Sequence, residues 1–511
     1  MMAAIVVCPS SFWCPQPSLE ELWDVSSPRD PVAFRELEQG AQRAAGQVAD
    51  QILGHHLTQV HQDAEFVRQA VQKVRDKSPI SLVNKGLKDV SVLLSGGTRI
   101  LLRTPYLRPD RRGKRGRKRT KRGPTGVGHY PVLEALGIRD GVSPATRSQI
   151  ALYPVQAGSY QEAIALLADR GLEVDPSTLA RIAQTTAQAD ISLREAALAQ
   201  ARALPLPEKG PLWGKRVRVS LDGGRVRTRK VRPGRKTRKG RHRLDTPWRE
   251  PRVLVIDLLD ENGATDPLRL PLYDVLLDDA DATFALLLGY LRLLGAAQAP
   301  VIEFIADGAD WIWSRAEILR QQAEIPAEKW VEAIDFYHAS EHLHAAVALC
   351  RSRSAKERQQ LYEQLRHTLR TDPQGVERVI HRLQQEAVTR RGKKMKKALA
   401  YFEKHTARMA YPDLDARKLP VGSGGVESAV RRVINTRFKA PGTFWNEEQV
   451  EGLMHLRACF KAGRWDEMMQ RVLTQTFVPP SFEPLTQKQK TALLLDLEES
   501  VVPEEDLRKA A

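Results

Sequence analysis

The chain has 511 residues, and 79 Lys or Arg against 62 Asp or Glu give it a formal net charge of +17 at pH 7. A content of 42% hydrophobic and 28% charged residues is ordinary for a globular protein, and the longest apolar run, residues 284–297, is interrupted by Arg292 and too short to span a membrane. We therefore expect no membrane partner, and the excess of positive charge favours a polyanion, nucleic acid first.

Residues 1–30 contain the short apolar segment AAIVVC without a basic stretch before it, which is not the pattern of a secretory signal. We expect a disordered leader there. The four cysteines, at positions 8, 14, 350 and 459, show neither metal-ligand spacing nor a disulfide framework. This usage fits a reducing compartment and predicts a cytoplasmic, nucleoid-associated protein.

Residues 31–140 begin with Ala-, Gln-, Glu- and Leu-rich sequence at helical spacing, with no strand signal before SVLLSGG at 91–97. Residues 96–109 are then predicted to form a hairpin strand. A cationic block without apolar residues follows at 108–123, and we interpret it as a basic linker that contacts DNA in preference to a merely solubilising one. Its predicted DNA-binding residues are Arg115, Arg117, Lys118 and Arg119.

Residues 141–210 are predicted to hold a helix-turn-helix region that binds DNA. Ser159 can cap one helix, Gly171 ends it, and Asp175-Pro176 provides the cap and first turn of the next. The short turn between the two helices fits the motif, although a plain helical hairpin has the same pattern.

From residue 215 the apolar period changes to that of strands. Three strands within 215–279, a helix at 282–296, a buried strand run at 301–313, a helix around 314–324 and a strand-to-helix segment at 329–350 predict an α/β fold with a mixed sheet. A second cationic block at 229–243 contains the predicted DNA-binding residues Arg232, Arg235 and Lys236. The predicted core comprises 211–345 and 421–475, interrupted by a charged helical insertion at 346–420 and followed by a tail at 476–511.

Three acids of this α/β region lie at the ends of predicted elements. Asp222 and Asp307 each close an apolar strand and precede glycine, and Glu427 begins a helix after the sequence GSGG. Strand ends are where open α/β sheets collect functional side chains. Singly, each has a simpler explanation, because Asp-Gly forms tight turns and Glu favours a helix N-terminus. Asp310 is the main rival to Asp307, but it lies three residues beyond the strand.

Carboxylates are suited to Mg²⁺, for which Mn²⁺ is a substitute, and three of them can hold two ions ~3.5–4 Å apart. Such a pair activates both the attacking and the leaving oxygen of an in-line phosphoryl displacement. The three acids therefore predict a two-metal site.

The order Asp222, Asp307, Glu427 resembles the DDE triad of transposases with an RNase H-like catalytic core, several groups of which carry a helical insertion before the Glu. ADGADWIW, DFYHASEHL and GSGGVESAVRRVINTRFKAPGTFW resemble, in turn, motifs of the Kra-type insertion-sequence transposases, relatives of the Mutator-like group. The similarity covers residues 140–470. It implies that the three acids are catalytic metal ligands and that Asp335 and His338, in the D-x-x-H signature, form an accessory pair. A structural histidine bonded to Asp335 is the alternative.

The cations that follow Glu427 are predicted to hold the DNA backbone. Arg431, Arg432 and Arg437 would position phosphates without reading sequence, and Trp445 would stack on an extruded base. The resemblance implies a transposase that cleaves DNA at terminal inverted repeats and joins the freed end to target DNA, as a homodimer or larger synaptic assembly. The alternatives are an RNase H-like nuclease or resolvase without strand transfer, and an inactive DNA-binding regulator.

Overall fold

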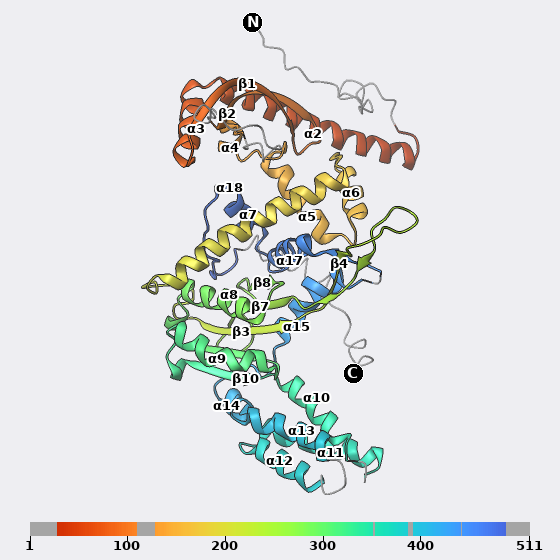
Figure 1. Cartoon of the computed structure of the whole chain (residues 1–511), viewed down its shortest axis with the longest axis vertical. Helices are drawn as coiled ribbons and strands as arrows, with labels where there is room; N and C mark the ends of the chain where they lie inside the picture. The colour runs from red at the N-terminus through yellow and green to blue at the C-terminus, as the bar shows by residue number, and fades with distance from the viewer. Residues whose placement is uncertain (1–27, 110–127, 351–352, 387–391, 441, 487–511) are drawn as a thin grey trace. The chain divides into compact units, whose positions relative to one another are not determined.

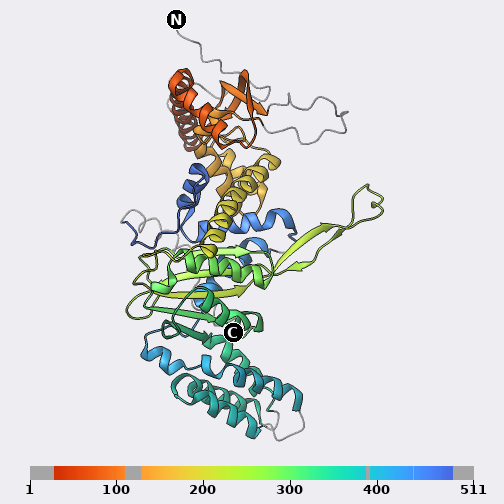
Figure 2. The same ribbon diagram turned by 60° about the vertical axis from the view of Figure 1, so that its left-hand side comes forward.

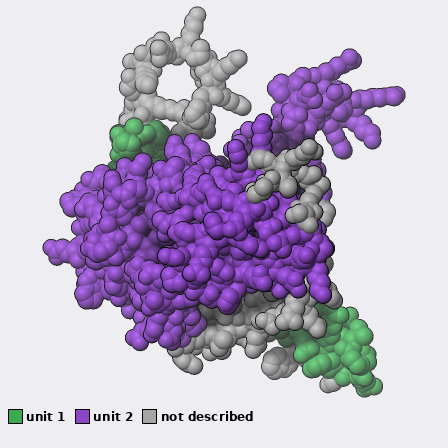
Figure 3. Space-filling model, turned by 90° about the horizontal axis from the view of Figure 1, so that it is seen from below, with its two compact units in different colours: residues 1–186, 472–474 green, residues 187–471, 475–511 purple. Residues whose placement is uncertain are grey.

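The computed structural model describes residues 28–109, 128–350, 353–386, 392–440 and 442–486 (Figure 1). Most of the predicted leader, most of the basic linker, including Arg115, Arg117, Lys118 and Arg119, and most of the tail lie outside these residues. The chain divides into two compact units, residues 1–186 with 472–474 and residues 187–471 with 475–511 (Figure 3). No helix in the described ranges is long and apolar enough to cross a membrane.

The first unit begins with two helices and a hairpin. Helices α2 (Pro31–Gln62) and α3 (Ala64–Lys77) are capped by the side chains of Asp30 and Asp63. Strands β1 (Leu82–Leu93) and β2 (Arg99–Pro109) pair antiparallel, so the predicted hairpin is confirmed. The expectation of no strand before residue 91 was wrong. Much of β1 is exposed, so its sequence lacks the apolar alternation by which a half-buried strand is recognised.

Helices make up the rest of this unit: α4 (Pro131–Ala135), α5 (Pro144–Gln156), α6 (Tyr160–Ala168) and the first part of α7 (Pro176–Ala203). The predicted caps are confirmed. Ser159 accepts a hydrogen bond from the amide of Glu162, and Asp175 accepts from the amides of Ser177 and Thr178. Gly171 ends the first helix at φ +76°, in the left-handed region that favours glycine. The two predicted helices and their turn are present, and DNA reading by them remains a prediction.

The second unit is built on a five-stranded mixed sheet in the order β10-β9-β3-β7-β8, which confirms the predicted α/β class (Figure 1). β3 runs antiparallel to β7 and parallel to β9, while β7 and β8 are antiparallel and β9 and β10 parallel. The strands are β3 (Arg216–Gly223), β7 (Arg252–Leu259), β8 (Leu272–Leu276), β9 (Val301–Ala306) and β10 (Trp330–Ile334). Each is short, apolar and mostly buried, as expected of a sheet covered by helices.

Helices α8 (Ala280–Leu293), α9 (Asp310–Gln322) and α10 (Phe336–Val347) follow β8, β9 and β10 in turn. The predicted strand run over 301–313 was too long, because the chain turns after Ala306 and enters α9 at Asp310. Trp311 and Trp313 belong to this helix, and the Trp313 ring packs edge-to-face on Phe304 in the core. Aromatic residues favour strands, so these two tryptophans led to the prediction of a strand where the helix begins.

Helices α11 (Ala355–Thr371), α12 (Gly375–Glu386), α13 (Gly392–His405) and α14 (Tyr411–Ala416) form the segment between α10 and Glu427, so its predicted helical content is confirmed. Their apolar faces join the core of the sheet through Leu365, Val379 and Phe402. The insertion is therefore packed against the core and contributes to it. Short 3₁₀ turns occupy Ala296–Gln298, Ala327–Lys329 and Thr406–Arg408.

The chain then returns to the sheet as α15 (Gly424–Val430), which continues through a π-helical turn (Arg431–Asn435) into α16 (Thr436–Phe438). Helix α17 (Glu447–Lys461) follows the short strand β11 (Trp445–Asn446). Helix α18 (Trp465–Thr474) is the last helix among the described residues.

Gly425 lets α15 lie directly on the sheet. A Cβ atom there would stand 2.8 Å from Nη2 of Arg218 and 3.2 Å from Oδ2 of Asp257. These two side chains form a buried ion pair between β3 and β7, and Arg218 also donates to Thr265 at 2.7 Å. Because the pair is held at several points, it has little freedom to move aside for a larger residue.

Replacing Gly425 by Ala should destabilise the second unit by about 1–3 kcal/mol, the usual cost of overpacking. Gly424→Ala is the matched control, because its Cβ would meet no atom within 4 Å. Urea unfolding, followed by tryptophan fluorescence, compares the two. Equal stabilities of the two variants would show that Gly425 does not set the approach of α15 to the sheet.

Candidate active site

Asp222 and Asp307 come from neighbouring parallel strands. β3 and β9 run side by side in the register Arg218↔Glu303 to Leu221↔Ala306, so both strands end at the same edge of the sheet. Continuing this register by one residue places Asp307 beside Asp222. Alternation puts Arg218, Ser220 and Asp222 on one face of β3, the face against which Gly425 packs. The two aspartates therefore meet at one sheet edge, beneath α15.

Glu427 lies in the first turn of α15, and Asp335 fixes the loop that leads into it. Asp335 is fully buried and caps α10 by accepting from the amides of Tyr337 (2.6 Å) and His338 (3.0 Å). Its other oxygen accepts from both the amide and the hydroxyl of Ser423, the latter at 2.6 Å. One carboxylate thus joins the start of α10 to the GSGG turn. It positions Glu427 through the backbone.

His338 faces Glu427 and does not bond to Asp335 through its ring. Its Nε2 lies 3.6 Å from Oε1 of Glu427, and its Nδ1 lies 3.7 Å from Oε2 of the exposed Glu341. The two residues of the D-x-x-H sequence therefore act at different points. Asp335 holds the backbone, and the imidazole of His338 contacts the third acid of the predicted triad.

The carboxylates interact electrostatically. Burial raises the pKa of Asp222 to about 6, and the charges of Asp307 and Glu427 contribute in the same direction, against the opposing effects of the Gly223 amide and His338. Burial, followed by the charge of Asp335, also raises the pKa of Glu427. The charges of Asp307 and Glu427 thus disfavour the ionised form of Asp222, and a bound cation would supply the opposite charge that favours it.

This donor set fits Mg²⁺ or Mn²⁺, because it consists of carboxylates from separate elements that gather at one edge of a sheet. The carboxylate oxygens of the three acids are nevertheless not all close enough to one another to bind a single ion. Among the described residues, one group of at least three His, Cys, Asp or Glu residues has its ligand atoms within 4.8 Å of one another. This group is Asp190, His455 and Cys459, which lie elsewhere in the structure.

Helix α13 of the insertion borders this site, which sequence reasoning missed. A Cβ on Gly308 would lie 2.2 Å from the Tyr401 ring, so this glycine lets Tyr401 approach the loop after Asp307. The Tyr401 hydroxyl is buried without a hydrogen-bond partner, and its ring stacks on His342 at 3.7 Å. Burial, with the nearby charge of Asp307, raises the pKa of Tyr401. The sequence around Gly308 gave no signal of this distant partner.

Asp310, the rival of Asp307, lies apart from this arrangement. It is the first residue of α9, its side chain is 81% exposed, and it pairs with Lys404 of α13. Asp307 instead caps the loop, accepting from the amide of Ala309 at 3.0 Å. The two acids are therefore in different surroundings, which makes Asp310 a control for Asp307.

The arginines after Glu427 have three different environments. Arg431 is exposed, whereas Arg432 is half-buried and donates to the Tyr273 hydroxyl at 2.6 Å. Arg437 is 3% exposed and its guanidinium lies 4.7 Å from the centre of the Trp445 ring. The prediction that Arg437 contacts the DNA backbone does not match its burial, whereas Trp445 is half-buried and its stacking on a base stays a prediction. Arg431 remains available for phosphate.

The second cationic block forms a projecting arm, defined here as residues 225–249 (Figure 2). It starts directly after Asp222-Gly223-Gly224. Its strand β4 (Val226–Val231) pairs antiparallel with the two short strands β5 (Leu244–Asp245) and β6 (Trp248–Arg249) and parallel with β11. All of residues 231–240 are exposed, including Arg232, Arg235 and Lys236. The arm therefore carries solvent-exposed cations, and in the sequence these cations lie close to Asp222.

No family model matches the chain, and no curated protein matches it either.

The raised pKa of Asp222 predicts a pH-dependent loss of stability without divalent cations. A carboxyl whose folded-state pKa is raised from 3.8 to about 6 stabilises the fold below pH ~4, and this contribution disappears as the pH rises through ~6. Asp222→Asn should therefore be more stable than the wild type at pH 7.5 in EDTA, by on the order of 1–2 kcal/mol. The difference should vanish near pH 4.

Urea unfolding at pH 4–8 measures this. Glu261→Gln is the control, because Glu261 is exposed in the turn after β7 and should leave the pH profile unchanged. Parallel profiles for the wild type and Asp222→Asn would show that the pKa of Asp222 is not raised in the folded chain.

Proposed function

We propose that this protein is a DDE-type transposase that cleaves DNA at the ends of a mobile element and joins them to target DNA. The observation that carries the proposal is the meeting of Asp222 and Asp307 at adjacent ends of two parallel strands, with Glu427 electrostatically coupled to Asp222. Such an arrangement of acids from distant parts of a chain is what metal-dependent phosphoryl transfer requires.

The architecture supports an RNase H-like core. The sheet is mixed, its first strand carries the first acid, and a helical segment separates the second acid from the third. This is the order of elements that the motif resemblance implies, which is why we favour a transposase over an unrelated α/β enzyme.

Asp222, Asp307 and Glu427 would hold Mg²⁺ or Mn²⁺, which supplies Lewis-acid activation of water and of the scissile phosphodiester. In the first step a water oxygen bonds to phosphorus and the 3′-oxygen leaves. In the second, the freed 3′-hydroxyl bonds to a target phosphorus and displaces a target 3′-oxygen. His338, beside Glu427, can orient that acid or take a proton from the attacking group, and Asp335 holds the loop that carries Glu427.

The exposed cations would hold the DNA. Arg431 lies one helical turn beyond Glu427, and Arg232, Arg235 and Lys236 lie on the arm. Phosphate contacts fix the position of a duplex without reading its sequence, so recognition of the terminal repeats falls to the helical region around α6 and α7. Two ends must be joined, and we therefore propose a dimer or larger assembly.

Purified protein with Mg²⁺ should nick a duplex carrying the inverted repeat that brackets its gene, and should join a pre-cut 3′ end to plasmid. Asp222→Asn, Asp307→Asn and Glu427→Gln should each reduce both rates by more than ~100-fold, which corresponds to ~2.7 kcal/mol of barrier. His338→Ala should lose about 10–100-fold, the range typical of groups that support metal ligands.

Asp310→Asn is the matched control and should retain full activity, because its carboxylate pairs with Lys404 on the surface. Cleavage without joining would assign a nuclease or resolvase. Binding of the repeat without any Mg²⁺-dependent cleavage, and without an effect of Glu427→Gln, would assign a DNA-binding regulator and contradict the catalytic proposal.

Removing the arm's cations should lower the affinity for DNA, and should also make this affinity less dependent on the salt concentration. For the triple variant Arg232→Ala, Arg235→Ala, Lys236→Ala, the slope of log K against log[salt] should fall by up to ~2.7, since each lost phosphate contact on duplex DNA changes it by ~0.9. Fluorescence anisotropy with a duplex of any sequence measures this slope. Lys356→Ala, an exposed cation on α11, should leave it unchanged. An unchanged slope in the triple variant would remove the arm from the DNA interface.

A further inference from the structure

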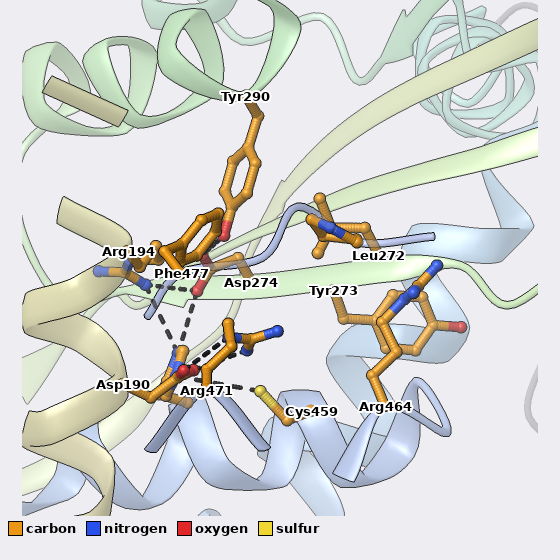
Figure 4. Close-up of a pocket in the computed structure, with 12 residues that line it drawn as sticks. Asp190, Arg194, Leu272, Tyr273, Asp274, Tyr290, Cys459, Arg464, Arg471 and Phe477 are labelled. Atoms are coloured by element: carbon orange, nitrogen blue, oxygen red, sulfur yellow. Dashed lines mark hydrogen bonds and ion pairs between the residues drawn. The ribbon is translucent and has the colours of Figure 1, made fainter. Parts of the chain in front are cut away.

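A buried cluster of polar side chains lies outside the predicted active site, on the β8 side of the sheet (Figure 4). Asp190 comes from α7, and His455 and Cys459 stand one turn apart on α17. Their exposed fractions are 0%, 3% and 7%. The proposed DNA chemistry uses none of these three residues.

Two of the three separations between the ligand atoms are close to those of a tetrahedral zinc site, and the third, between Asp190 and Cys459, is at most 4.8 Å. His455 Nε2 lies 2.9 Å from Asp190 Oδ2 and 3.9 Å from Cys459 Sγ, and all three ligand atoms lie within 4.8 Å of one another. Bonds of ~2.0–2.1 Å to nitrogen and oxygen and ~2.3 Å to sulfur, at tetrahedral angles, separate ligand atoms by about 3.3–3.6 Å. Shifts of a few tenths of an ångström would bring the pairs at 2.9 and 3.9 Å into this range.

The groups around the cluster are those that support metal ligands. Nδ1 of His455 lies 3.4 Å from Oδ1 of Asp274, and a carboxylate on the far nitrogen is the usual partner of a zinc-bound histidine. Asp274 is held in turn by Arg194 at 2.7 Å and by the Tyr290 hydroxyl at 2.7 Å. The ring orientation of His455 is therefore fixed.

All three residues also line one small cavity of about 20 Å³. That is room for about one water molecule. Leu272, Phe477 and Pro480 contribute its apolar wall. A fourth ligand can therefore be a water, and the apolar wall keeps bulk solvent away.

We propose that Asp190, His455 and Cys459 form a structural zinc(II) site that joins α7 to α17. The mixed carboxylate, imidazole and thiolate set favours zinc over Mg²⁺, which takes oxygen donors. Binding releases the thiol proton of Cys459 and the proton now shared by His455 and Asp190. Arg471, which donates to both oxygens of Asp190 at 2.7 and 2.8 Å, keeps one of these contacts when the other oxygen binds the ion.

The competing arrangement is a metal-free network of ion pairs. In it Arg471 pairs with Asp190 and Arg194 pairs with Asp274, so each carboxylate has a counter-charge without an ion. The two arrangements differ in one respect that can be measured. The thiolate of Cys459 is essential to the zinc site, and a thiol there adds little to the ion-pair network.

Elemental analysis of full-length protein purified without chelator should find about one zinc per chain that survives dialysis. Protein stripped and reloaded with Co²⁺ should show a thiolate-to-cobalt charge-transfer band. Cys459→Ala should lose both signals, and zinc should raise the melting temperature of the stripped wild type but not of this variant. Cys350→Ala, which removes another buried cysteine, should behave as the wild type.

The same measurements in the Asp222→Asn, Glu427→Gln background separate this site from the predicted active site, and zinc binding should persist there. A wild-type protein without the cobalt band, whose melting temperature does not respond to zinc, would overturn the proposal and leave the ion-pair network. The cobalt spectrum needs no variant, so a misfolded Cys459→Ala could not obscure the result.

Discussion

The parallel register between β3 and β9 is the constraint on which the site depends. Because Leu221 lies beside Ala306, the next residues along the two segments, Asp222 and Asp307, are brought to one end of the sheet although 84 intervening residues separate them in the sequence. A slip of one residue would send one carboxylate to the opposite face of the sheet. The buried apolar residues on the other face of β3, Val217, Val219 and Leu221, hold this register.

The acids and strand ends could be predicted from the sequence because each involves local signals, an apolar run followed by Asp-Gly or a glycine-rich turn before a helix. The succession of strands along the chain required no more than this, whereas their order in the sheet was not predicted. The exposed β1 and the aromatic start of α9 were misread, because burial and not propensity decides such segments. The burial of Arg437 against Trp445 has no local signal either, since a guanidinium beside an aromatic ring can stack in the core or stay in solvent.

Contacts between distant segments were the least predictable. Tyr401 reaches Gly308 across 92 intervening residues, and Asp190 reaches His455 across 264. Nothing in either pair's surrounding sequence specifies its partner. The i, i+4 spacing of His455 and Cys459 was the one available hint of shared ligation, and two residues on one helix face are too common to identify a site alone. Such clusters arise from tertiary packing and become visible only with coordinates.

The π-helical turn at Arg431–Asn435 places one more residue in a turn than an α-helix would. Every side chain after it is therefore rotated by about 100° relative to a continuous α-helix that began at Glu427. This offset lets one short helix put an acid over the sheet edge and, a few residues later, bury Arg437 beside Trp445 at the base of the arm. Loss of a single residue from this turn would rotate Arg437 away from Trp445 relative to Glu427, although both side chains would still be present in the chain.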